Sequence, residues 1–332
     1  MQQHQLLNIV RRFPERKLLI VGDSIADKFL TGSIARVSRE APVFILRHES
    51  TETVPGGAAN CALNLSALGA NVSLISIAGK DDAGNALREK LSAAGVNVDG
   101  LVLSDKVQTT TKVRILAGHA HAAKQQVIRV DYEDAPLKDS DGREAINAHL
   151  KTALSAADAV IISDYNYGLV DQQTIELVRE AQRAKSIPVL VDSRFRLSDF
   201  SGFTAATPNE DEVENLIGAP ITSTEELESS ASRLKEQLHY EALLVTRGSR
   251  GMMLLSDEDG PLHIPAVGTQ AVDGTGAGDT VIATFALALA SNASFAEAAH
   301  LANHAGGLVV MKRGTASISA AELEHSINDL KS

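Results

Sequence analysis

DGTGAGD, at residues 273–279, is the stretch that says most about the fold and the chemistry of this chain. Its three glycines lack a Cβ, so successive backbone N–H groups of the loop can converge on one anion. The residues that follow, VIATFALALA at 281–290, are rich in alanine and leucine and predict a helix. The loop would then lie at the positive end of that helix, with Asp279 in the first turn, an arrangement that favours phosphate binding beside a carboxylate.

The same loop has a plainer interpretation, a tight glycine turn with an aspartate that caps the helix. Two better-known phosphate-binding patterns do not fit it. The spacing of Gly274, Gly276 and Gly278 is neither that of a dinucleotide fingerprint, which also comes early in a chain, nor that of a Walker loop, whose lysine is missing here. The loop therefore indicates phosphate handling without either motif.

Composition and charge restrict the function classes. The chain has 332 residues, of which 44% are hydrophobic and 22% charged, as in ordinary soluble globular proteins. The formal net charge of −11 argues against nucleic acid or an anionic membrane as the main partner, so an anionic substrate must meet locally clustered cations. The single cysteine, Cys61, excludes internal disulfides and is expected in the core, and the N-terminus lacks the apolar segment of a secretory signal. A cytoplasmic protein is expected.

Short β-rich runs alternate with helical patterns over most of the chain. Strands are predicted at residues 17–22, 72–78, 159–163, 188–191 and 242–246, and helices at 58–68, 83–94, 172–184, 224–238, 295–310 and 320–330. This alternation is typical of an α/β fold, with a central, mostly parallel sheet flanked by helices on both faces. Because no linker or low-complexity tract divides the chain, one domain over residues 1–332 is expected.

Polar side chains follow several of the predicted strands, namely Asp23, Asp164, Asp192 and Thr246. Each aspartate alone is equally well explained as a turn or cap residue. In open α/β sheets, however, ligands bind at the edge formed by the carboxyl ends of the strands. The shared placement of these residues therefore predicts a binding site at that edge.

Two segments, residues 29–53 and 107–131, interrupt the alternation and are expected to form pairs of short strands with no helix between them. A small β-sheet lid over the site is the natural role, although a plain β insertion is also possible. The exposed edges of such a lid would be protected if two copies of the chain paired through it, so a homodimer is expected.

Five motifs, in this order along the chain, resemble those of the ribokinase-like (PfkB) family of sugar kinases: PGGAANCALNLSALG at 55–69, GKDDAG at 79–84, TPNEDE at 207–212, VTRGSRG at 245–251, and DGTGAGD. Within that family the chain most resembles the bacterial kinases of D-glycero-D-manno-heptose 7-phosphate. The residues that carry this narrower resemblance are 21–32, 36–43, 109–133, 163–168 and 312–319. Many bacteria fuse this kinase to an adenylyltransferase, and because the chain stops at Ser332 it resembles the stand-alone form.

The resemblance implies transfer of the γ-phosphoryl group of ATP to the anomeric hydroxyl of heptose 7-phosphate, a step of lipopolysaccharide inner-core synthesis. It implies that Asp279 is the general base, and that the N–H groups of Gly276, Ala277 and Gly278 stabilise charge on the transferred phosphoryl group. Phosphoryl transfer depends mainly on positioning and charge stabilisation, which suits this loop.

For the nucleotide, the resemblance implies a binding set of Asn209, Glu210, Asp211, Glu212, Thr246, Gly248, Gly251, Gly274 and Asn303. Asn209 and Glu212 match a family motif that holds Mg²⁺, usually through water, and a requirement for a monovalent cation such as K⁺ is left open. Without the family, TPNEDE is simply a good helix start and VTRGSRG an ordinary hairpin turn.

For the sugar, the resemblance implies hydroxyl-binding roles for Asp23, Asp27, Gly56, Gly57 and Asn60, with Asp192 also in the substrate site. The cations expected to bind the 7-phosphate are Lys112, Arg114 and Arg129 on the lid strands, with Arg194 and Arg196 as further candidates. Any one of these cations is more often a solvated surface charge.

Three residues depart from the close family pattern. Tyr167 replaces a lysine of a D-Y-x-K-G motif, Arg194 stands where relatives have lysine, and Arg313 precedes Gly314. These departures concern substrate contacts rather than phosphoryl transfer. His119 and His121 form an H-x-H pattern that is more typical of solvated loop histidines than of a metal site.

Three alternatives remain at this point: a PfkB-type kinase of another sugar or sugar phosphate, a non-catalytic sugar-phosphate sensor, and a nicotinamide oxidoreductase. The presence of Asp279 argues against the sensor, and the glycine spacing argues against the oxidoreductase.

Overall fold

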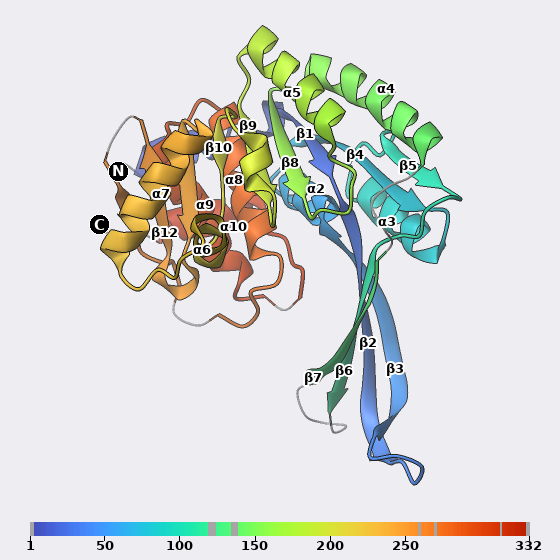
Figure 1. Ribbon diagram of the computed structural model, residues 1–332. Coiled ribbons are helices and arrows are strands. Elements are labelled where there is room, and N and C mark those ends of the chain that lie inside the picture. Colours follow the sequence, from blue (N-terminus) through green and yellow to red (C-terminus); the bar gives the residue numbers. More distant parts are fainter. Residues whose placement is uncertain are drawn as a thin grey trace.

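A nine-stranded sheet forms the centre of the protein (Figure 1). The computed structural model describes residues 3–118, 124–133, 139–257, 260–268, 271–312 and 314–329, so the His119 and His121 pattern and Arg313 lie outside the described residues. The strand order is β13-β12-β11-β10-β9-β8-β1-β4-β5. All neighbouring pairs are parallel except the last two at one edge, β11 with β12 and β12 with β13.

The strands of this sheet are β1 (Lys17–Gly22), β4 (Asn71–Gly79), β5 (Leu101–Ser104), β8 (Ala159–Asp164), β9 (Val189–Ser193), β10 (Ala205–Ala206), β11 (Ala242–Thr246), β12 (Met252–Ser256) and β13 (Leu262–Ile264). The α-helices are α1 (Gln3–Val10), α2 (Ala58–Ala67), α3 (Asp82–Ala93), α4 (Ser140–Ala156), α5 (Gln172–Lys185), α6 (Glu210–Ile217), α7 (Thr224–Leu238), α8 (Ala277–Ala290), α9 (Phe295–Val309) and α10 (Ala320–Asn328).

Both faces of the sheet are buried beneath helices. Along β1, Leu18 and Ile20 pack into a core that contains residues of α1, α2, α8, α9 and α10. The alternate residues, Leu19 and Val21, pack into a second core with residues of α4, α5, α6 and α7. Because side chains alternate across a strand, this separation gives the three-layer arrangement that the sequence predicted, and that prediction is confirmed. Cys61 lies fully buried in the first core, also as predicted.

The predicted strands and helices match the observed elements to within one or two residues at nearly every end. Five elements were not predicted, because their patterns are short or weak: α1, the four-residue β5, α4, the two-residue β10, and the three-residue β13. The segment TPNEDE begins α6, and VTRGSRG forms the turn between the antiparallel strands β11 and β12.

A second sheet of four strands projects from the body as a long lid (Figure 1). Its order is β3 (Phe44–Gly57), β2 (Ser24–Val37), β6 (Thr111–Gly118) and β7 (Gln125–Tyr132). The expected segments 29–53 and 107–131 cover most of these strands, but β2 begins earlier, at Ser24. The lid strands therefore start inside the body, next to the carboxyl end of β1, and carry their first residues into the site.

Among the described residues, no helix combines the length and apolar character required to span a bilayer.

Candidate active site

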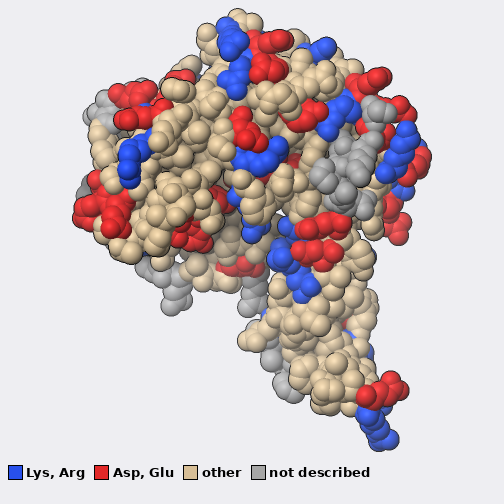
Figure 2. All heavy atoms as spheres, in the orientation of Figure 1, with Lys and Arg blue, Asp and Glu red and all other residues tan. Residues whose placement is uncertain are grey.

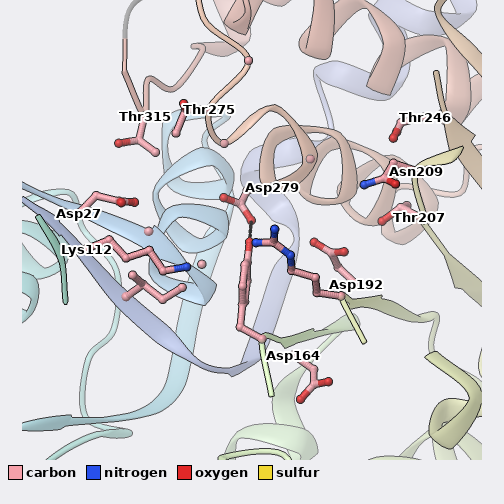
Figure 3. A pocket seen from close by; sticks show the side chains of 18 of the residues that line it. Asp27, Lys112, Asp164, Asp192, Thr207, Asn209, Thr246, Thr275, Asp279 and Thr315 are labelled. Carbon is pink, nitrogen blue, oxygen red and sulfur yellow. Dashed lines mark hydrogen bonds between the residues drawn. The ribbon is translucent and has the colours of Figure 1, made fainter. Parts of the chain in front are cut away.

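A cavity of about 350 Å³ lies where the base of the lid meets the carboxyl ends of β8, β9 and β11 and the start of α8. Figure 3 shows its two halves, with Asp279 between them. Asp27 and Lys112 of the lid lie on one side, and Thr207, Asn209 and Thr246 lie on the other. The predicted edge of the sheet thus holds the cavity.

Asp279, in the first turn of α8, is the central carboxylate of this cavity. Its side chain is buried, and each oxygen accepts one hydrogen bond: Asn60 Nδ2 donates to Oδ2 at 2.6 Å, and the Tyr165 hydroxyl donates to Oδ1 at 3.1 Å. Burial raises the pKa of Asp279 to about 6, and the two hydrogen bonds oppose that rise. At neutral pH the group is ionised yet basic enough to take a proton from a hydroxyl.

The glycine loop before Asp279 meets a specific backbone demand at Gly276. This residue caps α8 with φ of 77°, in the left-handed region, and a Cβ built there would lie 2.6 Å from Asn60 Nδ2. Ala277 N–H already donates to Gly274 O at 3.2 Å, whereas the described residues offer no acceptor to the N–H groups of Gly276 and Gly278. The free donors at this helix end therefore include the amides of Gly276 and Gly278.

Four further carboxylates line the cavity with Asp279, namely Asp27, Asp164, Asp192 and Glu212. Burial raises the pKa of Asp192 well above its ordinary value, and the charges of Asp279, Glu212 and Asp164 act in the same direction. Burial also raises the pKa of Glu212. A cavity that crowds carboxylates in this way would gain from a bound cation.

Asn209 and Glu212 line the cavity and also form the capping box of α6. The Asn209 side-chain oxygen accepts from Glu212 N–H at 2.8 Å, and Glu212 Oε2 accepts from Asn209 N–H at 2.9 Å. The helix start that TPNEDE predicts is thus confirmed, and the same two residues lie in the cavity. Among the described residues no group of three or more His, Cys, Asp or Glu side chains is arranged to ligate a metal directly.

Several residues of the predicted nucleotide set do not line the cavity, unlike Thr246 and Gly274, which do. Glu210 is engaged in ion pairs with Arg247, at 2.8 Å, and with Arg250, and Asp211 is exposed. Asn303 is buried, and its amide donates to Pro265 O at 2.8 Å. Gly248 and Gly251 form the turn after β11, at the positive φ values that favour glycine.

The lid contributes positive charge to the cavity. Lys112 is buried, and its ammonium group lies 5.9 Å and 5.8 Å from the ring centres of Tyr165 and Tyr167. Arg114 donates to Asp27 Oδ1 through Nε, at 3.2 Å, and Nη2, at 3.0 Å. No carboxylate lies within ion-pair distance of Lys112 in the described parts of the chain. Lys112 is therefore the less compensated of the two cations.

Arg129 does not line the cavity, contrary to the prediction that groups it with Lys112 and Arg114. It lies on β7, opposite Arg114, and pairs with Asp131 at 2.9 Å. Arg194 does line the cavity, but Arg196 is bound by Asp164, at 2.5 Å, and by Val170 O, at 3.0 Å. Of the predicted cations, Arg129 and Arg196 are thus ion-paired and do not line the cavity, whereas Lys112, Arg114 and Arg194 do.

Asp23 and Asn60 also have roles other than those predicted. Asp23 does not line the cavity, because its oxygens accept backbone N–H groups of Tyr165, Tyr167 and Leu169 at 2.9, 3.1 and 3.2 Å. Burial raises its pKa to about 6. Asn60 donates to Asp279 instead of facing open space. Both residues support the site rather than line it.

Gly56 and Gly57 line the cavity, as predicted. A Cβ at Gly56 would lie 2.4 Å from Asp27 Oδ2, and Gly57 begins α2 with φ of 58°. Both glycines therefore allow the close approach of lid and helix at this point.

Sequence reasoning assigned no role to several residues of the cavity. These are Ile25, Tyr165, Thr207, Thr275 and Thr315. Thr207 and Thr275 stand inside motifs quoted above, and Tyr165 directly follows the strand that ends at Asp164. Their positions in the sequence could therefore have predicted that they line the cavity. Thr315 belongs to the segment after α9, and only the three-dimensional fold brings it to the cavity, so the sequence alone did not indicate it.

Comparison with known proteins agrees with this geometry. The bifunctional protein HldE of Shewanella piezotolerans (strain WP3 / JCM 13877) is 42% identical over 322 residues, 96% of this chain and 64% of that protein. HldE of Pseudomonas aeruginosa (strain LESB58) is 39% identical over 317 residues, 95% of this chain and 64% of that protein. The chain thus spans a little under two thirds of these curated relatives.

Two solved structures share the fold. Phosphofructokinase-2 from Escherichia coli, in complex with substrates and products, has a TM-score of 0.78 at 20% identity, covering 95% of this chain and 99% of that one. Ribokinase from Arabidopsis thaliana, complexed with ribose and ATP, has a TM-score of 0.73 at 20% identity, covering 94% and 98%. The family model of the pfkB family carbohydrate kinases matches residues 18–322. The chain therefore belongs to the pfkB family of carbohydrate kinases.

Proposed function

We propose that this sugar kinase transfers the γ-phosphoryl group of ATP to the anomeric hydroxyl of D-glycero-D-manno-heptose 7-phosphate, giving the 1,7-bisphosphate. The observation that carries the proposal is the position of Asp279. It is a buried carboxylate with a raised pKa, one turn from the free N–H groups of Gly276 and Gly278. The base would then act on the attacking hydroxyl oxygen, and the anion-binding helix end on the equatorial oxygens of the transferred phosphoryl group.

In the proposed step, the proton of the sugar hydroxyl passes to Asp279 while the hydroxyl oxygen forms a bond to the γ-phosphorus. The bond from that phosphorus to the oxygen bridging the β- and γ-phosphates breaks, and ADP leaves with the electron pair. The N–H groups of Gly276 and Gly278 stabilise the equatorial oxygens. Ala277 joins them only if its N–H leaves Gly274 O.

The half of the cavity formed by Thr207, Asn209 and Thr246 suits the nucleotide, because it lies beyond Asp279 from the lid (Figure 3). Asn209 and Glu212 would hold Mg²⁺ there through water, since a carboxylate whose pKa is raised by burial suits a hard cation. When bound, that ion supplies charge neutralisation at the phosphates. Gly274 lines the same cavity, and because a Cβ built there would meet nothing within 4 Å, this position leaves room for a phosphate chain.

The lid half suits a sugar phosphate. Asp27 and the backbone of Gly56 and Gly57 offer partners for hydroxyl groups, and Lys112 offers an ammonium group without a carboxylate partner among the described residues. Arg114 and Arg194 add charge at the rim of the same cavity. Anionic substrates of an acidic protein require such a local cluster of cations.

The choice of heptose 7-phosphate rests on the sequence resemblance described above and on the relatives named HldE, two of which are 42% and 39% identical to this chain over 322 and 317 aligned residues. A coupled assay of ADP release over a panel of sugars and sugar phosphates tests it. Heptose 7-phosphate should give the highest kcat/KM. A higher value for ribose, fructose or a hexose phosphate, with heptose 7-phosphate at background, would show that the protein is a sugar kinase with a different substrate.

We also propose that two copies of the chain pair through the lid. The strand register places Asp27, Lys112 and Arg114 on the face toward the cavity, and the alternate residues Ile128 and Val130 on the opposite face. That opposite face is apolar and exposed, with Ile128 at 55% and Val130 at 41%. Figure 2 shows few charges along the lid between its tip and its base. A second copy would cover this face.

A further inference from the structure

Tyr165 links the general base to the rigid part of the site. It is the first residue after β8, and its hydroxyl donates to Asp279 Oδ1 at 3.1 Å. Asn60 occupies the other oxygen of Asp279 at 2.6 Å. Each oxygen thus has one protein donor and keeps lone-pair capacity for a substrate hydroxyl. The carboxylate is held from two elements, α2 and the segment after β8.

The backbone around Tyr165 is fixed independently of Asp279. Asp23 accepts the N–H groups of Tyr165, Tyr167 and Leu169, and it is buried at the end of β1. Asn166, between the two tyrosines, has φ of 64°, so the turn has a defined and uncommon conformation. A side chain that leaves such a turn has a fixed starting point, which is the requirement for orienting a neighbour.

The other charged and titratable groups near Asp279 come from several elements. Asp27 of β2 raises the pKa of Asp279, Asp192 of β9 shares the cavity, and Cys61 of α2 is buried beside it. Asp27 is paired with Arg114, and neither Asp192 nor Cys61 donates to Asp279 in the described structure. Tyr165 and Asn60 are therefore the groups that can stabilise the ionised form.

We propose that Tyr165 is a positioning residue of the phosphoryl transfer, which orients Asp279 and keeps it ionised through the hydrogen bond from its hydroxyl. The inference rests on the proposed role of Asp279 as general base. Burial raises the pKa of Tyr165 well above its ordinary value, and the charge of Asp279 adds to that effect. The hydroxyl therefore stays protonated and acts as a donor throughout the working pH range, and it does not take the substrate proton itself.

Tyr165→Phe tests the proposal, because it removes the hydroxyl and keeps the ring beneath Lys112. Loss of a donor to a carboxylate raises the pKa of that carboxylate, so the acid limb of kcat/KM against pH should move from about 6 to higher pH. At a fixed pH near 7, kcat should fall roughly ten- to a hundredfold, the effect of losing a hydrogen bond to a charged group. KM values should change less than kcat, because the contact acts on the base.

Tyr167→Phe is the matched control. It removes a hydroxyl from the same turn and keeps a ring near Lys112, but that hydroxyl donates to Glu133 at 2.5 Å and not to Asp279. Its acid limb should stay where the unmodified enzyme has it. An acid limb that moves equally in both variants would show that the turn as a whole, and not the hydroxyl of Tyr165, controls the base, and would overturn the proposal.

The Asp279→Asn background separates this inference from the proposed function. If Asp279→Asn retains the normal rate, the base assignment fails whatever Tyr165 does. If Asp279→Asn is inactive but Tyr165→Phe keeps the normal acid limb and kcat, only the role of Tyr165 fails. In the double variant, Tyr165→Phe should cause no further loss of the residual rate. Thermal unfolding of Tyr165→Phe, expected near that of Tyr167→Phe, checks that a lower rate does not reflect misfolding.

Discussion

At the scale of single residues, the site depends on a balance around Asp279. Burial raises the pKa of this carboxyl, two hydrogen bonds lower it, and the result is a pKa of about 6. Because a general base works best with a pKa near the working pH, the cost of burying this charge would serve the proposed role of Asp279. Burial of the ionised Asp279 therefore lowers the stability of the folded protein at the same place where the proposed chemistry occurs.

Asp279→Asn should separate proton acceptance by this residue from substrate binding by the cavity. The variant keeps the shape of the side chain but cannot accept a proton, so kcat should fall by roughly 10² to 10⁴. Calorimetric titration should still detect nucleotide and sugar, because the lining residues are unchanged. A rate within a fewfold of the unmodified enzyme, measured by ADP release, would remove Asp279 from the mechanism.

The same variant should be more stable than the unmodified chain at pH 7.5. The folded pKa of about 6 lies above the ordinary value of 3.8, so the stability that this group contributes is fully present below pH 3.8 and is lost as pH rises through 6. Asp279→Asn avoids that loss, a gain of at most about 3 kcal/mol in unfolding free energy. Urea unfolding at pH 7.5 and pH 5 measures it. An equal gain at both values would contradict the assignment.

At the scale of elements, the start of α8 joins a capped helix end to the catalytic loop. The sequence predicted this element well, because a glycine run before an alanine- and leucine-rich stretch is a local signal. It predicted the contacts of Asp23, Glu210 and Arg196 poorly, because the partners described above lie 26 or more positions away along the chain. The local sequence around a charged residue does not reveal whether its side chain binds substrate or forms an ion pair with another residue of the protein.

Gly276→Ala should disrupt this element, and Gly274→Ala is its control in the same loop. Alanine at 276 must adopt φ of 77° and would meet Asn60 Nδ2 at 2.6 Å, whereas a Cβ at Gly274 meets nothing within 4 Å. Gly276→Ala should lower the unfolding free energy by about 1–3 kcal/mol, and Gly274→Ala by under about 1 kcal/mol. Thermal melts of the two variants compare them. Equal melts would mean that the loop adjusts freely and that the cap geometry is not required.

At the scale of the whole molecule, the lid is a sheet with two different faces. Its inner face carries Asp27, Lys112 and Arg114 into the cavity, and its outer face carries Ile128 and Val130. The part of the lid that carries Ile128 and Val130, on β7, projects away from the helices of the body (Figure 1). An isolated sheet of this size is marginally stable in water without a covered apolar face. Pairing and catalysis would then depend on the same four strands.

The double variant Ile128→Glu and Val130→Glu should abolish the proposed pairing, because it places two like charges on the face that the second copy would cover. Sedimentation at micromolar concentration should show a dimer for the unmodified chain and a monomer for this variant. Thr152→Glu, which adds an exposed charge on α4 away from the lid, should remain a dimer. In the monomer the inner face loses support, so KM for the sugar phosphate should rise more than KM for ATP. An unmodified chain that sediments as a monomer at these concentrations, or a double variant that stays a dimer, would rule out pairing through this face.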